Sequence, residues 1–227
     1  MAVGISILFA IYKSKQPQQI RIEIKTSNTI VTIWFGDLFA SPGHKVIPVN
    51  EYFDSELGEY VSPKSLHGLF IKRILGGNSL VFDNLADESL ATTKCEIQQR
   101  ERGRIKRYPI GTTAVVTMND EKYFLVALSK TNMQTLKASA DIPQLWTALE
   151  GLWKQVRISS GDCAVSIPLI GGGLSGIGLP STQLLQLIIL SIVSETKKTR
   201  IAPEIKIILQ EDLYKEVDLE LIARNWR

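Results

Sequence analysis

The chain has 227 residues, of which 44% are hydrophobic and 22% are charged, so the composition excludes a disordered protein and the length fits one large domain. Its 26 Lys and Arg against 23 Asp and Glu leave a net charge of only +3, and the excess lies in one segment instead of on a basic face. The sequence therefore does not favour a general nucleic-acid binder, because such a protein contacts many phosphates over one surface. The two cysteines, Cys95 and Cys163, form no metal-binding motif, so we expect no metal, no disulfide framework and a reducing, intracellular setting.

The first element is an apolar run over residues 1–12, followed by Lys13 and Lys15. About 12 apolar residues are too few to cross a bilayer, which takes about 20, and the run lacks the preceding charge and the cleavage site of a signal peptide. Two interpretations stay open. The run is a buried element that begins the domain, or it is the end of a membrane helix with the lysines as cytoplasmic flanking charges. We divide the chain into an apolar segment, residues 1–15, and one domain, residues 16–227.

Alternation with a period of two residues predicts a hairpin after this segment. Ile20, Ile22 and Ile24 alternate with charged residues, and a β-branched run over residues 29–35 follows the turn pair Ser27-Asn28. Further strands are predicted over residues 45–49, 112–117, 123–128, 162–170 and 204–209, and helices over residues 69–75, 142–156, 181–196 and 212–226. Strands that alternate with helices favour an α/β fold, with helices on both faces of a mostly parallel sheet.

One short segment holds the excess positive charge. Residues 94–107 contain six basic and two acidic residues, a net charge of +4 in a chain whose total is +3. The pattern favours a solvated connector between two structured elements. The alternative is an electrostatic contact to an anionic ligand or a lipid headgroup.

Three features follow predicted strands directly: Gly36-Asp37, Asn50 and the loop over residues 171–178, which has five glycines in eight residues. In open α/β sheets, ligands bind outside the carboxyl ends of the strands. Glycines let backbone N–H groups approach an anion closely, and the helix predicted after this loop adds partial positive charge at its N-terminus. The loop matches neither a P-loop nor a dinucleotide fingerprint, so a tight strand-to-helix connection is an equal alternative.

The polar residues at these positions each have two interpretations. Asp37 can accept a hydrogen bond from an exocyclic amine such as that of adenine, or it can cap the next element. Asn50 suits ribose hydroxyls or a turn. His67 is more typical of a structural histidine, because no motif places a nucleophile or carboxylate beside it. Ser175 lies in GLSGI, which lacks the second glycine of a hydrolase nucleophile elbow, so no catalytic residue is expected.

The ordered set of motifs resembles a macro domain, the ADP-ribose-binding fold. These motifs are WFGDL, VIPVN, GTTAVVT, KYFLVAL and SIPLIGGGLSG. The spacing of GDLF, IPVNEYFD, SLHG, RYPIGTTA, ALSKTN and IPLIGGG is similar, more narrowly, to the divergent macro domain of membrane-anchored Thoeris anti-phage effectors. The resemblance implies a three-layer sandwich in which helices cover both faces of a mixed, mostly parallel sheet.

The resemblance also implies a ligand site. Asp37 would contact the adenine amine, Asn50 would lie by the distal ribose, and two loops, residues 65–68 and 171–176, would cradle the diphosphate. The implied ligand-binding residues are Asp37, Leu38, Asn50, Ser65, Leu66, His67, Gly68, Gly171, Gly172, Gly173, Leu174, Ser175 and Gly176. Glu51 and Asp54 follow Asn50 closely, and their position suggests that they meet the amino group of a conjugated ligand.

By the same resemblance, the domain is a non-enzymatic sensor that needs no cofactor. A partner TIR protein would make an ADP-ribose-derived signal from NAD, such as a histidine conjugate, and the bound domain would activate a membrane effector. We therefore expect a homo-oligomer on the cytoplasmic side of the bacterial inner membrane, with no nucleic-acid partner. The alternative is an ADP-ribosyl or nucleotide hydrolase on the same fold, and a third interpretation is an interaction module whose glycine loop is purely structural.

Overall fold

The computed structural model describes residues 17–25, 27–173 and 176–226. The apolar run over residues 1–12, and with it the choice between a buried element and a membrane helix, lies outside these residues. Among the residues described, no helix combines the length and the apolar character that a membrane crossing requires.

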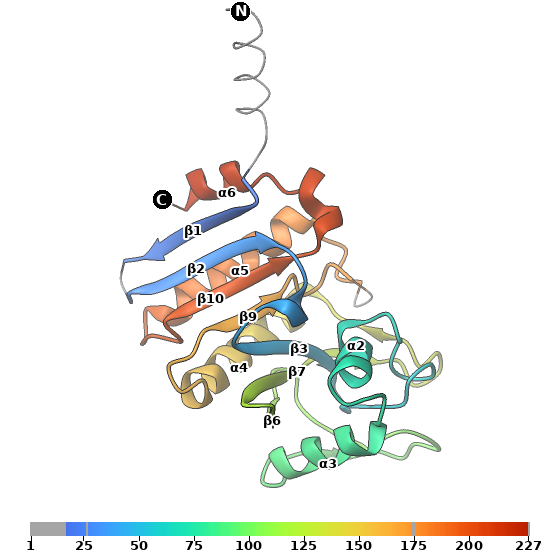
Figure 1. Cartoon of the computed structure of the whole chain (residues 1–227). Helices are drawn as coiled ribbons and strands as arrows, with labels where there is room; N and C mark the ends of the chain where they lie inside the picture. The colour runs from blue at the N-terminus through green and yellow to red at the C-terminus, as the bar shows by residue number, and fades with distance from the viewer. Residues whose placement is uncertain (1–16, 26, 174–175, 227) are drawn as a thin grey trace, which may run out of the picture.

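Eight strands of the described chain form one mixed sheet (Figure 1). They are β1 (Gln19–Ile24), β2 (Thr29–Phe35), β3 (His44–Asn50), β6 (Thr113–Met118), β7 (Glu121–Thr131), β8 (Ala138–Ser139), β9 (Val165–Pro168) and β10 (Glu204–Leu209). The order is β1-β2-β10-β9-β3-β7-β6, with β8 also paired to β7. Neighbours from β2 to β7 are parallel, whereas β1, β6 and β8 are antiparallel to their partners. The five parallel strands therefore end at one edge of the sheet.

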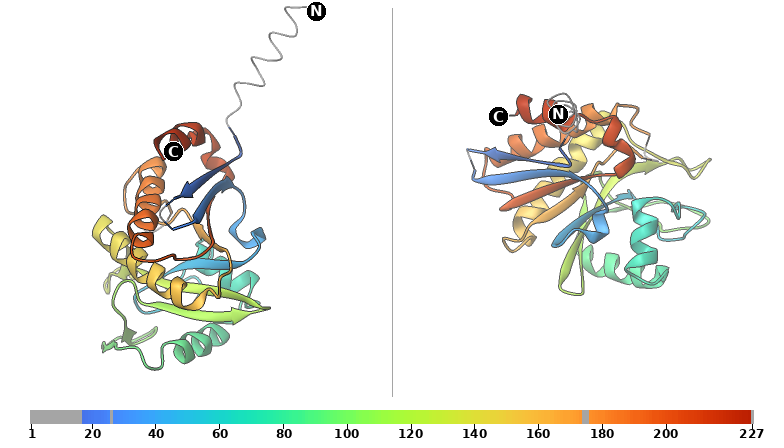
Figure 2. Two further views of the ribbon diagram at one scale, coloured as in Figure 1. Left: turned by 90° about the vertical axis from the view of Figure 1, so that its left-hand side faces the viewer. Right: turned by 45° about the horizontal axis from the view of Figure 1, so that its top comes forward.

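Helices cover both faces of this sheet (Figure 2). The helices are α2 (Leu66–Arg73) and α3 (Ser79–Ser89) on one face and α4 (Ile142–Ser159), α5 (Ser181–Thr196) and α6 (Leu219–Asn225) on the other, with short 3-10 helices η1 (Leu38–Ala40) and η2 (Glu211–Lys215). This arrangement confirms the predicted three-layer α/β sandwich with a mixed, mostly parallel sheet.

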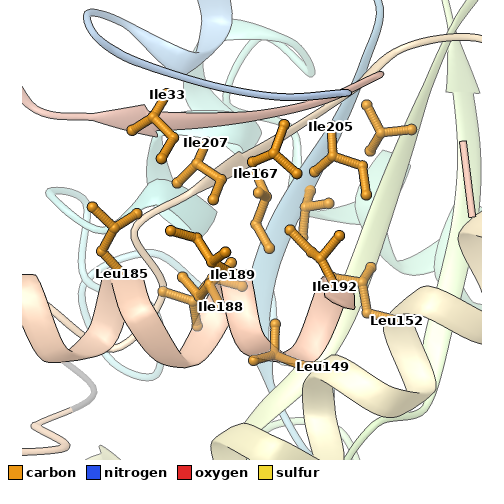
Figure 3. Close-up of a cluster of buried hydrophobic side chains, with 14 of the residues drawn as sticks. Ile33, Leu149, Leu152, Ile167, Leu185, Ile188, Ile189, Ile192, Ile205 and Ile207 are labelled. Carbon is orange, nitrogen blue, oxygen red and sulfur yellow. The ribbon is translucent and has the colours of Figure 1, made fainter. Parts of the chain in front are cut away.

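Two hydrophobic clusters separate the layers, because successive strand side chains point to opposite faces. In β3, Val46 packs with the α4 and α5 cluster and Ile47 packs with the α2 and α3 cluster. Figure 3 shows the first cluster, in which isoleucines of β2, β9 and β10 lie over Ile188, Ile189 and Ile192 of α5. Each such fully buried side chain contributes about 1.5–3 kcal/mol of transfer free energy, so the sheet edge that carries the strand ends rests on a rigid core.

Most predicted elements are confirmed, but several need correction. The helix predicted over residues 69–75 begins earlier, at Leu66, and ends at Arg73, so residues 66–68 of the predicted first loop are helical. A strand over residues 162–170 is too long, since β9 covers only Val165–Pro168. The single terminal helix over residues 212–226 is wrong, because η2 and α6 are separate. Helix α3 was not predicted, although Asn78 caps it by accepting a hydrogen bond from Val81 N at 3.3 Å. A further difference concerns residues 94–107 and is described with the site.

Candidate ligand-binding site

The carboxyl ends of the parallel strands border a cavity of about 840 Å³, within the range of small-molecule sites. Its walls come from the ends of β3 and β7, the segments β3–α2 and β7–β8, the glycine loop after β9 and the residue after β10. The lining residues are Pro48, Val49, Asn50, Gly58, Glu59, Tyr60, Val61, Ser62, Pro63, Lys64, Ser65, Leu66, His67, Leu69, Leu128, Ser129, Leu136, Lys137, Ala138, Gly171, Gly173 and Gln210. The cavity therefore lies where open α/β sheets bind ligands.

The first wall is the turn that leads into α2. Ser65 caps this helix, since its Oγ accepts a hydrogen bond from Gly68 N at 3.0 Å and donates one to Ser62 O at 2.7 Å. A Cβ on Gly68 would lie 2.2 Å from Ser62 O, so the close packing of this turn requires glycine. Leu66 and His67 begin the helix, and their N–H groups have no acceptor within it. Both residues line the cavity, so the wall carries two amides and the positive end of the helix dipole, which favour an anion.

The second wall is the glycine loop after β9. Gly171 has a φ of +95°, and a Cβ there would lie 2.6 Å from Ile177 Cδ1, so this position also requires glycine. Among the described residues, none lies within 4 Å of a Cβ built on Gly173, although Gly173 lines the cavity. Its backbone is therefore open to a ligand that approaches from the cavity.

Charged side chains around the cavity are mainly basic. The lining includes the exposed Lys64 and Lys137 and the carboxylate of Glu59. Two ammonium groups against one carboxylate give the opening a net positive charge, because the glycine loop and the strand ends add no charged side chain to the lining. Such a charge attracts an anionic ligand and raises its rate of association.

The end of β3 is held by the side chain of Asn50. Its Oδ1 accepts hydrogen bonds from Tyr52 N and Asp54 N, both at 3.1 Å, and its Nδ2 donates to Asp54 Oδ2 at 3.0 Å. Between them, Phe53 has a φ of +54°, which costs a non-glycine residue about 1–3 kcal/mol. The three hydrogen bonds offset this strain, so the turn interpretation of Asn50 is confirmed. Asn50 also lines the cavity, and its contact with a ribose stays a prediction.

Glu51 and Asp54 lie behind the cavity wall. Glu51 is 7% exposed, and its Oε1 accepts a hydrogen bond from Thr131 N at 3.3 Å. Burial raises the pKa of the Glu51 carboxyl. Asp54 is 1% exposed and forms an ion pair with Arg100 at 3.0 Å. Neither residue belongs to the described lining, so contact of either with a ligand stays a prediction and requires this turn to open.

Asp37 lies beside the cavity, next to the end of β10. Its Oδ1 accepts a hydrogen bond from Phe39 N at 3.0 Å, and its Oδ2 pairs with Arg73 at 2.7 Å. Partial burial raises the pKa of the Asp37 carboxyl, but these partners outweigh it and hold that pKa below its ordinary value. The bond from Gly36 N to Leu209 O, 2.8 Å long, places Gly36, the residue before Asp37, beside the end of β10. Gln210, which follows β10, lines the cavity. The capping interpretation is confirmed, and the adenine contact stays a prediction.

His67 is packed in the manner of a structural histidine. Its ring centroid lies 4.7 Å from that of Phe82 in α3, and the side chain is 5% exposed. Burial lowers the pKa of His67 to about 3, so the imidazole is neutral at physiological pH. Its Nε2 is buried without a hydrogen-bond partner among the described residues.

Residues 94–107, called the strap below, are ordered by ion pairs. They form the hairpin of β4 (Glu96–Ile97) and β5 (Lys106–Arg107). Arg104 crosses to α3 and pairs with Asp83 at 3.0 Å and with Asp87 at 2.8 Å. The side chains of Arg100 and Arg104 are only 1% and 12% exposed, so the predicted solvated connector is wrong for both. Contact of the exposed basic residues with an anionic ligand or lipid stays a prediction.

Only some of the predicted site residues line the cavity. Six predicted residues line it: Asn50, Ser65, Leu66, His67, Gly171 and Gly173. Seven described ones lie outside the lining, namely Asp37, Leu38, Glu51, Asp54, Gly68, Gly172 and Gly176; of these, Leu38 is a core residue at 3% exposure. Leu174 and Ser175 lie outside the described residues. The sequence analysis missed Glu59, Tyr60, Leu136, Lys137 and Gln210, and only Gln210, directly after a predicted strand, carried a signal.

The sheet order and the two loops define a macro-domain fold, and comparisons with solved structures agree. The chain is similar to an Oceanobacillus iheyensis macrodomain solved with ADP, at 11% identity and a TM-score of 0.60, over 91% of this chain and 97% of that one. It is also similar to a Trypanosoma brucei macrodomain in complex with ADP-ribose, at 8% identity and a TM-score of 0.55, over 84% and 68%. Such identities show the fold alone.

The family follows from the sequence. The family model described as Thoeris protein ThsA, Macro domain, matches residues 31–210, so the chain belongs to this family and the predicted resemblance is confirmed. No curated protein matches the chain.

Proposed function

We propose that this domain binds an ADP-ribose-derived nucleotide and acts as a non-enzymatic sensor. One observation carries the proposal: the cavity has the N-terminal turn of α2 on one wall and the open backbone of Gly173 on another. Backbone amides on two walls suit a diphosphate, which needs several donors and no particular side chain. Membership of the ThsA macro-domain family and the likeness to macrodomains solved with ADP and ADP-ribose support this class of ligand.

In the proposed complex, the diphosphate lies between the turn at Leu66 and His67 and the loop at Gly173. The adenine extends past Gln210 toward Asp37, whose carboxylate accepts a hydrogen bond from the exocyclic amine. The distal ribose lies by Asn50. Lys64 and Lys137 at the opening attract the anionic ligand and speed its binding.

The hydrogen bonds that Asn50 and Asp54 already make support binding without catalysis. Asn50 and Asp54 bond to each other and to backbone groups, and Arg100 occupies both oxygens of Asp54, at 3.0 and 3.1 Å. A general base needs a free lone pair within reach of the reacting group. An ADP-ribosyl hydrolase remains the alternative, and it predicts turnover that Asn50→Ala abolishes without loss of binding. Prolonged incubation of ADP-ribosylated substrate with stoichiometric protein tests this, and we expect the substrate to survive unchanged.

The sensor role extends the binding proposal. In this scheme a partner TIR protein makes the nucleotide from NAD, for instance as a histidine conjugate, and the bound domain changes its homo-oligomeric state and activates a membrane effector at the bacterial inner membrane. A ligand shifts an equilibrium between two states only if it binds them with different affinity. The segment over residues 62–68 is the one through which the ligand would favour one state, because it lines the cavity and its Ser65 caps α2.

Calorimetry tests the binding proposal directly. We expect the folded domain to bind ADP-ribose, ADP or a histidine conjugate of ADP-ribose, and mass spectrometry of a denatured preparation identifies any nucleotide that copurifies. Light scattering with and without the bound nucleotide measures the change of assembly state. A folded domain that binds none of the three compounds would refute the proposal, and binding without any change in assembly would refute the sensor step alone.

A further inference from the structure

A buried guanidinium connects the strap to the wall of the cavity. The Arg100 guanidinium carbon lies 4.0 Å from the ring centroid of Tyr52 and 4.9 Å from that of Tyr60. The same group donates two hydrogen bonds to Asp54, at 3.0 and 3.1 Å, and one to Arg104 O at 2.6 Å. Its side chain is 1% exposed. A buried cation held against two rings and a carboxylate has little freedom to move.

Two residues in contact with this cluster belong to the cavity lining. Tyr60 is the one phenylalanine, tyrosine or tryptophan ring in the lining, as far as the described residues show. Asn50, also in the lining, donates to the Asp54 oxygen that Arg100 Nη2 binds. The guanidinium therefore stands behind both the aromatic part of the first wall and the turn at the end of β3.

The packing around the cluster leaves no freedom for these groups. A Cβ on Gly103, which has a φ of +77°, would lie 2.8 Å from Asp54 Oδ1, 3.0 Å from Arg100 Nη2 and 3.1 Å from the Tyr60 ring. The strap backbone thus closes over the guanidinium from outside. Because interiors are close-packed, a change in Arg100 must move the tyrosine, the turn or both.

We propose that Arg100 is a positioning residue for nucleotide binding, which acts through Tyr60 and the Asn50–Asp54 turn. This inference rests on the proposed function. Arg100 does not belong to the lining among the described residues, so it touches no ligand and sets the place of groups that do. The role requires arginine, because a lysine offers neither the planar face that stacks between two rings nor the fork that binds both carboxylate oxygens.

The test compares Arg100→Lys with a matched control on the same strap. Lys106→Met removes a cation that is 46% exposed and paired with the half-exposed Asp87. We expect Arg100→Lys to weaken ADP-ribose binding at least tenfold in calorimetry, and Lys106→Met to change it less than twofold. Hydrogen exchange of the amides over residues 58–65 should become faster in Arg100→Lys, while exchange in β10 and α5 stays unchanged.

A double-mutant cycle separates positioning from general stability. If Arg100 acts through Tyr60, the two substitutions remove the same contribution. The double variant Tyr60→Leu with Arg100→Lys should then lose less affinity for ADP-ribose than the product of the two single fold-losses. Should Arg100→Lys fail to fold, Asp54→Asn with Arg100→Gln removes both buried charges and serves in its place. A dissociation constant within twofold of the wild type in the folded variant, or strictly multiplicative losses, would overturn the inference. A wild-type protein that binds no ADP-ribose refutes the proposed function instead.

Discussion

Replacing Gly173 with glutamate puts a negative charge into the cavity wall without disturbing the fold. A Cβ at this position meets nothing within 4 Å in the part of the chain that the structure describes, and the Gly173 backbone is outside the left-handed region. Glutamate and glutamine therefore both fit, and they differ only in charge. The pair Gly173→Glu and Gly173→Gln isolates the electrostatic part of ligand binding, since both carry a side chain of the same size into the cavity.

The size of the effect follows from Coulomb's law. At about 8 Å and an effective dielectric constant of about 20, one pair of like charges costs about 2 kcal/mol. A diphosphate carries two charges, and the flexible glutamate swings partly toward water, so we expect a net loss of about 2–3 kcal/mol. This loss corresponds to a roughly 30- to 150-fold higher dissociation constant for the glutamate variant than for the glutamine variant.

Calorimetry with ADP-ribose at low and at physiological salt measures the difference. It should shrink as salt rises, because the cavity is open to solvent and screening reaches it. Thermal unfolding of both variants should match that of the wild type. Equal dissociation constants for the two variants would show that no phosphate lies near Gly173, and the proposed binding mode would be wrong.

Three further predictions concern residues around the same cavity. Gly68→Ala places a Cβ 2.2 Å from Ser62 O and should lower the free energy of unfolding by about 1–3 kcal/mol and weaken ligand binding, whereas Gly173→Ala should do neither in thermal melts and calorimetry. The pKa of His67 in the folded state, about 3, lies below its unfolded value, so the unfolded state takes up the proton first as the pH falls. The free energy of unfolding should therefore decrease as the pH drops from about 6.5 to about 3, by about 2 kcal/mol at pH 5. Urea unfolding of His67→Gln should lack this decrease, and an equal decrease in both proteins would contradict the prediction. Asp37→Asn keeps an oxygen that caps η1, but the amide lacks the negative charge that strengthens a hydrogen bond from the adenine amine. The variant should therefore bind ADP-ribose about tenfold more weakly than the wild type. The hypoxanthine analogue, which lacks this amine, should bind equally to both proteins.

The sequence was sufficient for seven of the eight strands of the described sheet, because their patterns are local, whereas the two-residue strand β8 carries no such pattern. Strong β-branched runs predict β2 and β10. The apolar run of α5 is too long for a strand, so it predicts a helix. Helix α3 was missed although five of its residues, Leu80, Val81, Phe82, Leu85 and Ala86, are apolar. Only Phe82 and Ala86 are buried, and the helix is stabilised by packing against α2 and by Arg104 of the strap. Tertiary contacts of this kind override local preference.

The site was predictable where backbone geometry decides it. Gly171 requires glycine for a local reason, and a glycine-rich stretch after a strand makes this visible in the sequence. The strap was misread because charge alone does not show which guanidinium is buried: Arg100 and Arg102 are identical as letters, but their side chains are 1% and 75% exposed. Only the fold places Asp54, Tyr52 and Tyr60 around Arg100. The side chain of Tyr60 likewise reaches the cavity through a loop that no periodic pattern describes.

The position of Cys163 relative to the ligand entrance determines how the molecule can be immobilised or labelled. Gln19 lies opposite Trp34, near the carboxyl end of β2, so β1 begins at the rim of the sheet that carries the ligand entrance. Cys163 is exposed and precedes β9 by two residues, at the opposite rim. After Cys95 is replaced, coupling a biosensor chip or a dye to that thiol leaves the entrance facing solvent.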